Sequence, residues 1–265
     1  MKMSTLIVLA VAGLLVITGA VRVMSGAEGP PVSRQAADAL FNQGNFKDAY
    51  ESYRALTLAP GTDPADVEHA LASLTQLGRL GESDAFLEAA LTAHKGDARI
   101  ATAVAVCYME DVSHRGFIVA GAFTRGNQRR PGGLYVDATA HDRVRALQLL
   151  TDALPAMQAD PDRARAGRFF LKLADALTLA RIPGEAWRLQ SLTPLDVLPD
   201  FDKSYRYRPW NGGAAGAPVA ADGSPVYYRT PENFEKAAND GERWRWALAQ
   251  AVEADAGLLN TVRAT

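Results

Sequence analysis

The sequence is poor in cysteine and has no large excess of charge of either sign. Cys107 is the single cysteine among 265 residues, so an intrachain disulfide and a cysteine-based metal cluster are both excluded. It shares a helical stripe with Ile100 and Val104, which predicts a buried, unreactive thiol rather than a nucleophile. The formal net charge of −2 gives no global electrostatic reason to expect nucleic acid as a partner.

Sequence motifs that support well-known chemistries are also missing. The four histidines lie far apart, without the spacing of metal ligands: His69, His94, His114 and His141. Neither the Gly-x-Ser-x-Gly turn of a serine hydrolase nor a phosphate-binding loop occurs. We therefore predict a protein that is not an enzyme, with no cofactor and no bound metal.

A long apolar run occurs only near the beginning of the sequence. A lysine precedes the uncharged residues 3–21, and Ser25 and Ala27 are the small residues that a cleavage site requires. The run can serve as a membrane anchor and slightly exceeds the usual apolar part of a signal peptide. We expect residues 1–27 to be one or the other, followed by a linker over 28–32. In both cases the rest of the chain is expected in the cell envelope, periplasmic or otherwise extracytoplasmic.

The remaining sequence shows helical periodicity and an internal repeat. Gly44 and Gly78 lie 34 positions apart, and each is followed by a large apolar residue, a small residue and further apolar positions at helical spacing. That period and pattern are typical of the tetratricopeptide repeat, in which glycine permits the tight turn between two antiparallel helices. We therefore expect a mainly α fold, a tetratricopeptide-like solenoid of helical hairpins over residues 33–192.

Capping residues indicate where some of these helices begin. Asp63-Pro64 combines a typical N-cap residue with a proline that suits the first helical position. Asp160-Pro161 repeats this signal, which predicts a second helix start there. Thr139 with Asp142 resembles a capping box and predicts a further start.

Residues 116–137 interrupt the helical pattern. Two β-prone runs, 117–119 and 134–136, flank a loop rich in glycine, arginine and asparagine, which predicts a small β-hairpin insertion. This basic stretch is either a solvated loop or a contact for an acidic partner. Three of its arginines are the candidates for such a contact: Arg125, Arg129 and Arg130.

The character of the sequence changes after residue 192. Residues 193–265 begin with an aromatic and glycine-rich segment, in which Asp222-Gly223 between two β-prone runs predicts a β-hairpin. Thr230-Pro231 is expected to start another helix. Trp244 is expected to face the core in the terminal helix, with its arginine neighbours at the rim.

Three segments carry a resemblance to a known family. The first joins residues 116–121 to 135–137 and 142–147, the second is 225–230, and the third is 240–246. Together they resemble the N-terminal helical region of large bacterial alpha-2-macroglobulin-like envelope proteins. The resemblance implies a part in trapping proteases in the periplasm or at the cell surface. That family's Cys-x-Glu-Gln thioester motif is absent here, so no catalytic or thioester residue is carried over.

Two kinds of function follow from these observations. Helical repeats are binding scaffolds, so the first is a non-enzymatic protein-interaction scaffold of the cell envelope, the N-terminal part of a protease-trapping protein if the resemblance holds. The alternative is a glycan- or ligand-binding protein or an enzyme with its site in the aromatic segment 205–228. The first function predicts a protein or peptide partner on the concave surface. Polar residues on the first helix of each pair are the candidate contacts: Gln35, Gln43, Glu68, Gln76 and Arg99.

Overall fold

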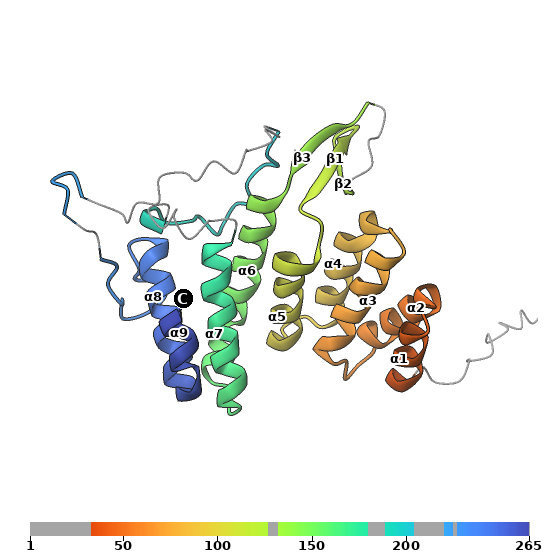
Figure 1. Cartoon of the computed structure of the whole chain (residues 1–265), viewed down its shortest axis with the longest axis horizontal. Coiled ribbons are helices and arrows are strands. Elements are labelled where there is room, and N and C mark those ends of the chain that lie inside the picture. The colour runs from red at the N-terminus through yellow and green to blue at the C-terminus, as the bar shows by residue number, and fades with distance from the viewer. Residues whose placement is uncertain (1–32, 127–131, 180–188, 204–219, 225–226, 265) are drawn as a thin grey trace, which may run out of the picture. The chain divides into compact units, whose positions relative to one another are not determined.

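Nine α-helices and a small sheet occur in the residues that the structure, a computed structural model, describes: 33–126, 132–179, 189–203, 220–224 and 227–264 (Figure 1). The first five helices are α1 (Arg34–Asn42), α2 (Phe46–Leu58), α3 (Pro64–Gln76), α4 (Ser83–Ala93) and α5 (Ala98–Val106). The others are α6 (Thr139–Gln158), α7 (Arg163–Thr178), α8 (Asp240–Ala254) and α9 (Leu259–Ala264). The prediction of a mainly helical fold is confirmed.

Helices that follow one another along the chain pack side by side, as the ribbon shows for α1 with α2, α5 with α6 and α7 with α8 (Figure 1). Each contributes one apolar face, and these faces meet in a core that extends from Ala37 in α1 to Ala251 in α8. Burying a leucine or phenylalanine side chain in this way stabilises a fold by about 1.5–3 kcal/mol. Leu71, Leu147 and Phe170 are among the largest fully buried members.

The two glycines of the repeat occupy equivalent turns. Gly44 and Gly78 have φ angles of 76° and 67°, in the left-handed region that costs other residues about 1–2 kcal/mol. After each glycine, the next residue donates its backbone N–H to the carbonyl oxygen five positions earlier, at 2.9 Å in both turns. The tight turns predicted between α1 and α2 and after α3 are confirmed.

Of the two Asp-Pro signals, only the first marks the start of a helix as predicted. Asp63 caps α3 with its side chain, and a proline occupies the first helical position. α7 instead begins two residues beyond Pro161, because the carboxylate of Asp162 accepts the backbone N–H of Arg165 at 3.0 Å. The carboxylate of Asp160 instead accepts hydrogen bonds from the guanidinium of Arg165. The start predicted at Asp160-Pro161 is therefore wrong by two residues.

α6 begins at Thr139 as expected, but for a different reason. The backbone N–H of Thr139 donates to the carboxylate of Asp137 at 2.8 Å. Asp142, the expected partner of a capping box, is fully buried and points away from this terminus to bind Arg125. The capping-box interpretation is wrong, because the carboxylate of Asp142 is hydrogen-bonded to the buried guanidinium of Arg125.

The insertion forms a three-stranded antiparallel sheet with the strand order β2-β1-β3. Its strands are β1 (Arg115–Val119), β2 (Ala122–Arg125) and β3 (Leu134–Asp137). β1 pairs with β3 across the two runs that the sequence indicated, but it also pairs with β2, a strand that the sequence did not indicate. The tight turn joining β1 to β2 is Ala120-Gly121, whose φ angles are 49° and 83°. The predicted two-stranded hairpin is therefore incomplete.

The C-terminal part departs from the prediction in two places. A turn is present at residues 220–224, where the N–H of Gly223 donates to the carbonyl of Ala220 at 2.9 Å. Residues 218, 219, 225 and 226 of the expected hairpin lie outside the described residues, and 227–230 do not form a strand. No helix begins at Thr230-Pro231; α8 begins at Asp240, because Asn239 accepts the backbone N–H of Glu242 at 2.9 Å.

In α8 the prediction holds for Trp244 and fails for Arg243. Trp244 is half-buried and packs against the core, and Arg245 is exposed at the rim. Arg243 is buried rather than at the rim: its guanidinium donates to the carbonyl of Thr193 and lies 4.7 Å from the Phe234 ring centroid. Trp246, which the sequence analysis did not place, is only 3% exposed and makes edge-on contacts with Phe170 and Phe234.

Within the described ranges, no helix is both long enough and apolar enough to cross a bilayer. The apolar run 3–21 and the linker 28–32 lie outside the described residues.

Candidate functional site

A cavity of about 350 Å³ lies at α3, α5 and α7. Its apolar lining comes from Ala103 and Val106 on α5, Met157 near the end of α6, and Phe169 on α7. The apolar periodicity of α5, α6 and α7 places most of their apolar side chains in the core, and these four lie where the core borders the cavity. A volume of this size suits a small molecule or a few residues of a peptide.

Four basic side chains line the same cavity, and three of them have a carboxylate partner. Arg99 is paired with Asp97 at 2.9 Å. Arg165 is paired with Asp160, and Lys172 with Glu110 at 2.5 Å. Because these pairs are exposed at least on one side, each stabilises the fold only slightly.

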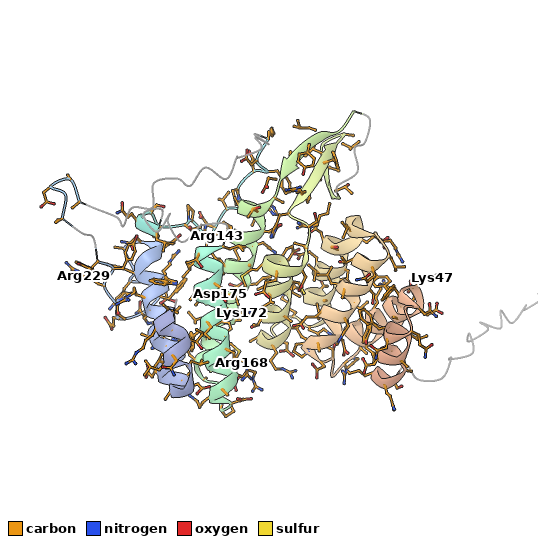
Figure 2. The ribbon with its side chains drawn as sticks, viewed as in Figure 1. Lys47, Arg143, Arg168, Lys172, Asp175 and Arg229 are labelled. Carbon is orange, nitrogen blue, oxygen red and sulfur yellow. The ribbon has the colours of Figure 1, made fainter. Side chains whose placement is uncertain are left out.

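Arg168 is the basic lining residue without a hydrogen bond or ion pair to any part of the chain that the structure describes. Arg168 lies on α7 with Lys172, which follows it by slightly more than one turn (Figure 2). Arg165 precedes Arg168 by almost one turn of the same helix. The side chain of Arg168 is exposed, so a guanidinium with five N–H donors is available to a ligand.

Glu68 lines the cavity from α3 and, among the described residues, also lacks a hydrogen-bonding or ion-pair partner. The residue is exposed overall, yet neighbouring atoms remove water from its carboxyl group and so raise its pKa. The negative charges of Asp111 and Glu110 raise this pKa further. A cationic or N–H-donating ligand group would therefore bind favourably beside Glu68.

Apart from Arg125, the residues predicted to contact a partner fall into three groups. Glu68 and Arg99 line the cavity together. Gln35, Gln43 and Gln76 are exposed on or beside α1 and α3 but are not part of the lining. Arg129 and Arg130 lie outside the described residues.

Arg125 was predicted to reach a partner, and this is wrong because the side chain is buried. It is 4% exposed and donates hydrogen bonds to the carboxylates of Asp142 at 2.7 Å and of Asp84 at 2.7 Å. Burial alone would lower the pKa of Arg125, but the two carboxylates raise it, so the guanidinium stays charged. His114 contributes a further contact, from its Nδ1 to Asp142 at 2.7 Å. Arg125 therefore attaches the small sheet to α4 and α6.

Arg165, Arg168 and Lys172 are basic cavity residues that were not predicted from the sequence. A sequence signal for these basic residues existed. Residues 165, 168 and 172 recur at helical spacing, on a different face of the helix from the apolar residues of α7.

The other chemistries considered from the sequence find no site in the described part of the chain. No group of three or more potential metal ligands comes together there. Cys107 is fully buried, and loss of water around its thiol raises its pKa, as expected for an unreactive thiol. Residues 205–219 of the alternative aromatic site lie outside the described residues. No protein-family profile, curated protein or solved structure matches this chain.

Proposed function

We propose that this chain is a non-enzymatic interaction scaffold whose α3/α5/α7 cavity holds a peptide segment of a partner protein. The observation that carries the proposal is the cavity itself, with the unpaired Arg168 and Glu68 beside an apolar lining. Unpaired charges next to apolar surface are the features that pair with a partner in protein interfaces.

The scaffold is, in this proposal, a tetratricopeptide-like solenoid. Support comes from the turns at Gly44 and Gly78, which recur at the period of that repeat and share one hydrogen-bond pattern. In such a solenoid, α1, α3, α5 and α7 are the first helices of successive pairs, and three of them line the cavity.

The lining also describes the partner segment. An apolar side chain would occupy the space beside Val106 and Phe169. An acidic side chain or the carboxylate of a chain end would bind Arg168, and a basic side chain or a backbone N–H would bind Glu68. The segment is thus an apolar residue flanked by opposite charges.

Selection from a random peptide library on the immobilised chain tests this function. The affinity of the selected peptides for Arg168→Gln and for Glu68→Gln should be about tenfold lower than for the parent, a loss of about 1.4 kcal/mol. Fluorescence anisotropy with labelled peptides measures it. Both residues are exposed, so each substitution should change the free energy of unfolding by no more than about 0.5 kcal/mol.

Lys47→Gln provides the matched control. Lys47 is an exposed lysine on α2 that does not line the cavity (Figure 2). Its substitution should leave the affinity of every selected peptide unchanged. Peptides that bind the parent and both cavity variants equally well would contradict a role for this cavity.

We also propose that the scaffold lies in the cell envelope. The apolar run 3–21 and the resemblance to the N-terminal region of alpha-2-macroglobulin-like envelope proteins support this location. Alkaline phosphatase fused after the C-terminal residue should be active in bacterial cells, because the enzyme matures only outside the cytoplasm. An inactive fusion, together with an active cytoplasmic reporter at the same position, would contradict the location.

A further inference from the structure

A second cavity, of about 380 Å³, lies beside α8 and α9, separate from the α3/α5/α7 cavity. α8 contributes Trp244, Leu248 and Val252, which lie four residues apart and therefore on one face of the helix. α9 contributes Val262, so one part of the lining is aliphatic and aromatic. We call this space the α8/α9 cavity.

The polar groups of the α8/α9 cavity are mainly hydrogen-bond donors. Arg245 from α8 and Arg263 from α9 both line it, and neither is hydrogen-bonded or ion-paired to any described residue. The buried indole Nε1 of Trp244 likewise has no hydrogen-bond partner. An unpaired buried donor of this kind costs a fold about 1–3 kcal/mol.

No carboxylate belongs to the lining formed by the described residues. The acidic side chains of α8 and its C-terminal cap are hydrogen-bonded elsewhere. Glu242 accepts the N–H of Ala238, and Glu253 accepts an amide N–H of Gln250. Asp255 accepts the N–H of Gly257 in the turn that leads to α9. No described carboxylate in the lining therefore compensates the positive charge of Arg245 and Arg263.

We propose that the α8/α9 cavity binds an amphipathic monoanion, namely a carboxylate that carries an aliphatic chain. The carboxylate would accept hydrogen bonds from Arg245 and Arg263, which are the donors that suit it best. The chain would lie against Trp244, Leu248 and Val252, where its burial removes apolar surface from water. A ligand of this kind satisfies both parts of the lining, which a purely apolar or a purely ionic ligand does not.

Titration of the full chain with octanoate, octanol and octylammonium tests the proposal. Octanoate should bind saturably. Octanol should bind with an affinity at least about tenfold lower, because charged hydrogen bonds contribute about 1.5–3 kcal/mol. Octylammonium should not bind. Isothermal calorimetry measures the affinities. The indole N–H resonance of Trp244, assigned through its loss in Trp244→Phe, should shift on addition of octanoate.

The double variant Arg245→Gln/Arg263→Gln should bind octanoate at least about tenfold more weakly than the parent. Arg54→Gln is the matched control, since Arg54 is an exposed arginine on α2 that does not line the cavity. Equal affinity for octanoate and octanol, or an affinity for octanoate that the double variant retains, would overturn the proposal. Arg168→Gln and Glu68→Gln, the variants of the α3/α5/α7 cavity, should bind octanoate with the same affinity as the parent.

Discussion

Replacing Asp142 by asparagine is expected to lower the free energy of unfolding by about 3–5 kcal/mol, because it breaks a buried ion pair. Asp142 is fully buried, and its two oxygens accept hydrogen bonds from Arg125 at 2.7 and 2.8 Å. The variant retains the size of the side chain but leaves the buried guanidinium with Asp84 as its remaining carboxylate. Chemical denaturation followed by circular dichroism measures the change.

Asp152→Asn is the control for this substitution, since Asp152 is an exposed acid on the same helix. It should change the free energy of unfolding by no more than about 0.5 kcal/mol. If Asp142→Asn lowers the free energy of unfolding by less than about 1 kcal/mol, the ion pair between Arg125 and Asp142 does not stabilise the fold, and the account of this contact is contradicted.

The same ion pair predicts a pH dependence. Burial alone would raise the pKa of Asp142, but hydrogen bonds from Arg125 and His114 outweigh it and hold the pKa well below its ordinary range. A carboxyl group with a lowered pKa in the folded state stabilises the protein above its unfolded pKa of about 3.9. Its contribution is lost as the pH falls below that value. The difference in stability between parent and Asp142→Asn should therefore decrease as the pH falls below about 4.

Replacing Leu87 by alanine is expected to cost about 2–5 kcal/mol of stability, the range for removing a leucine side chain from a packed core. Leu87 lies on α4 and is fully buried in the core. Phe46→Ala should cost less, because Phe46 is only half-buried and contacts Phe41 at its edge, with 5.3 Å between the ring centroids. Thermal and denaturant unfolding of both variants measure the effects. Equal losses in the two variants would contradict the burial described here.

The helices were predictable where local signals and tertiary packing agree. Gly44 and Gly78 are needed for φ angles that other residues avoid, so a glycine at each position was informative by itself. Asp63 followed by a proline predicted the start of α3, because the N-cap hydrogen bond forms within one helical turn and needs no distant partner. The apolar periodicity after Gly44 and Gly78 indicated which residues of α2 and α4 form the core.

Several errors occurred where a long-range contact decides the structure, and others arose from local turns and caps. Nothing local distinguishes Arg125 from the arginines near it; it is buried because Asp84 and Asp142, distant in sequence, meet it. β2 was missed because an alanine, Ala120, adopts a left-handed conformation in the turn before it. In α8, contacts with Thr193 and Phe234 bury Arg243, which the sequence placed at the rim.

The candidate site was predictable in part. Glu68 and Arg99 were chosen because they lie on first helices and off the apolar stripe, and both line the cavity. The same rule also selected Gln35 and Gln76, which do not line it. Sequence periodicity gives the face of a helix but not where neighbouring helices diverge enough to leave a cavity. The unpaired state of Arg168 depends on every neighbouring carboxylate and is visible only in the structure.

Mapping the position of a bound peptide tests the central claim most directly. A peptide selected on the parent chain is made with a photoreactive benzophenone in place of its apolar residue, cross-linked, and located by mass spectrometry. The cross-links should fall on the helices that line the cavity: α3 (Pro64–Gln76), α5 (Ala98–Val106) and α7 (Arg163–Thr178). At a peptide concentration near the parent's dissociation constant, they should be several times weaker in Arg168→Gln and unchanged in Lys47→Gln. Cross-links on α2, α4 or α8, unchanged in Arg168→Gln, would contradict a peptide-binding role for the α3/α5/α7 cavity.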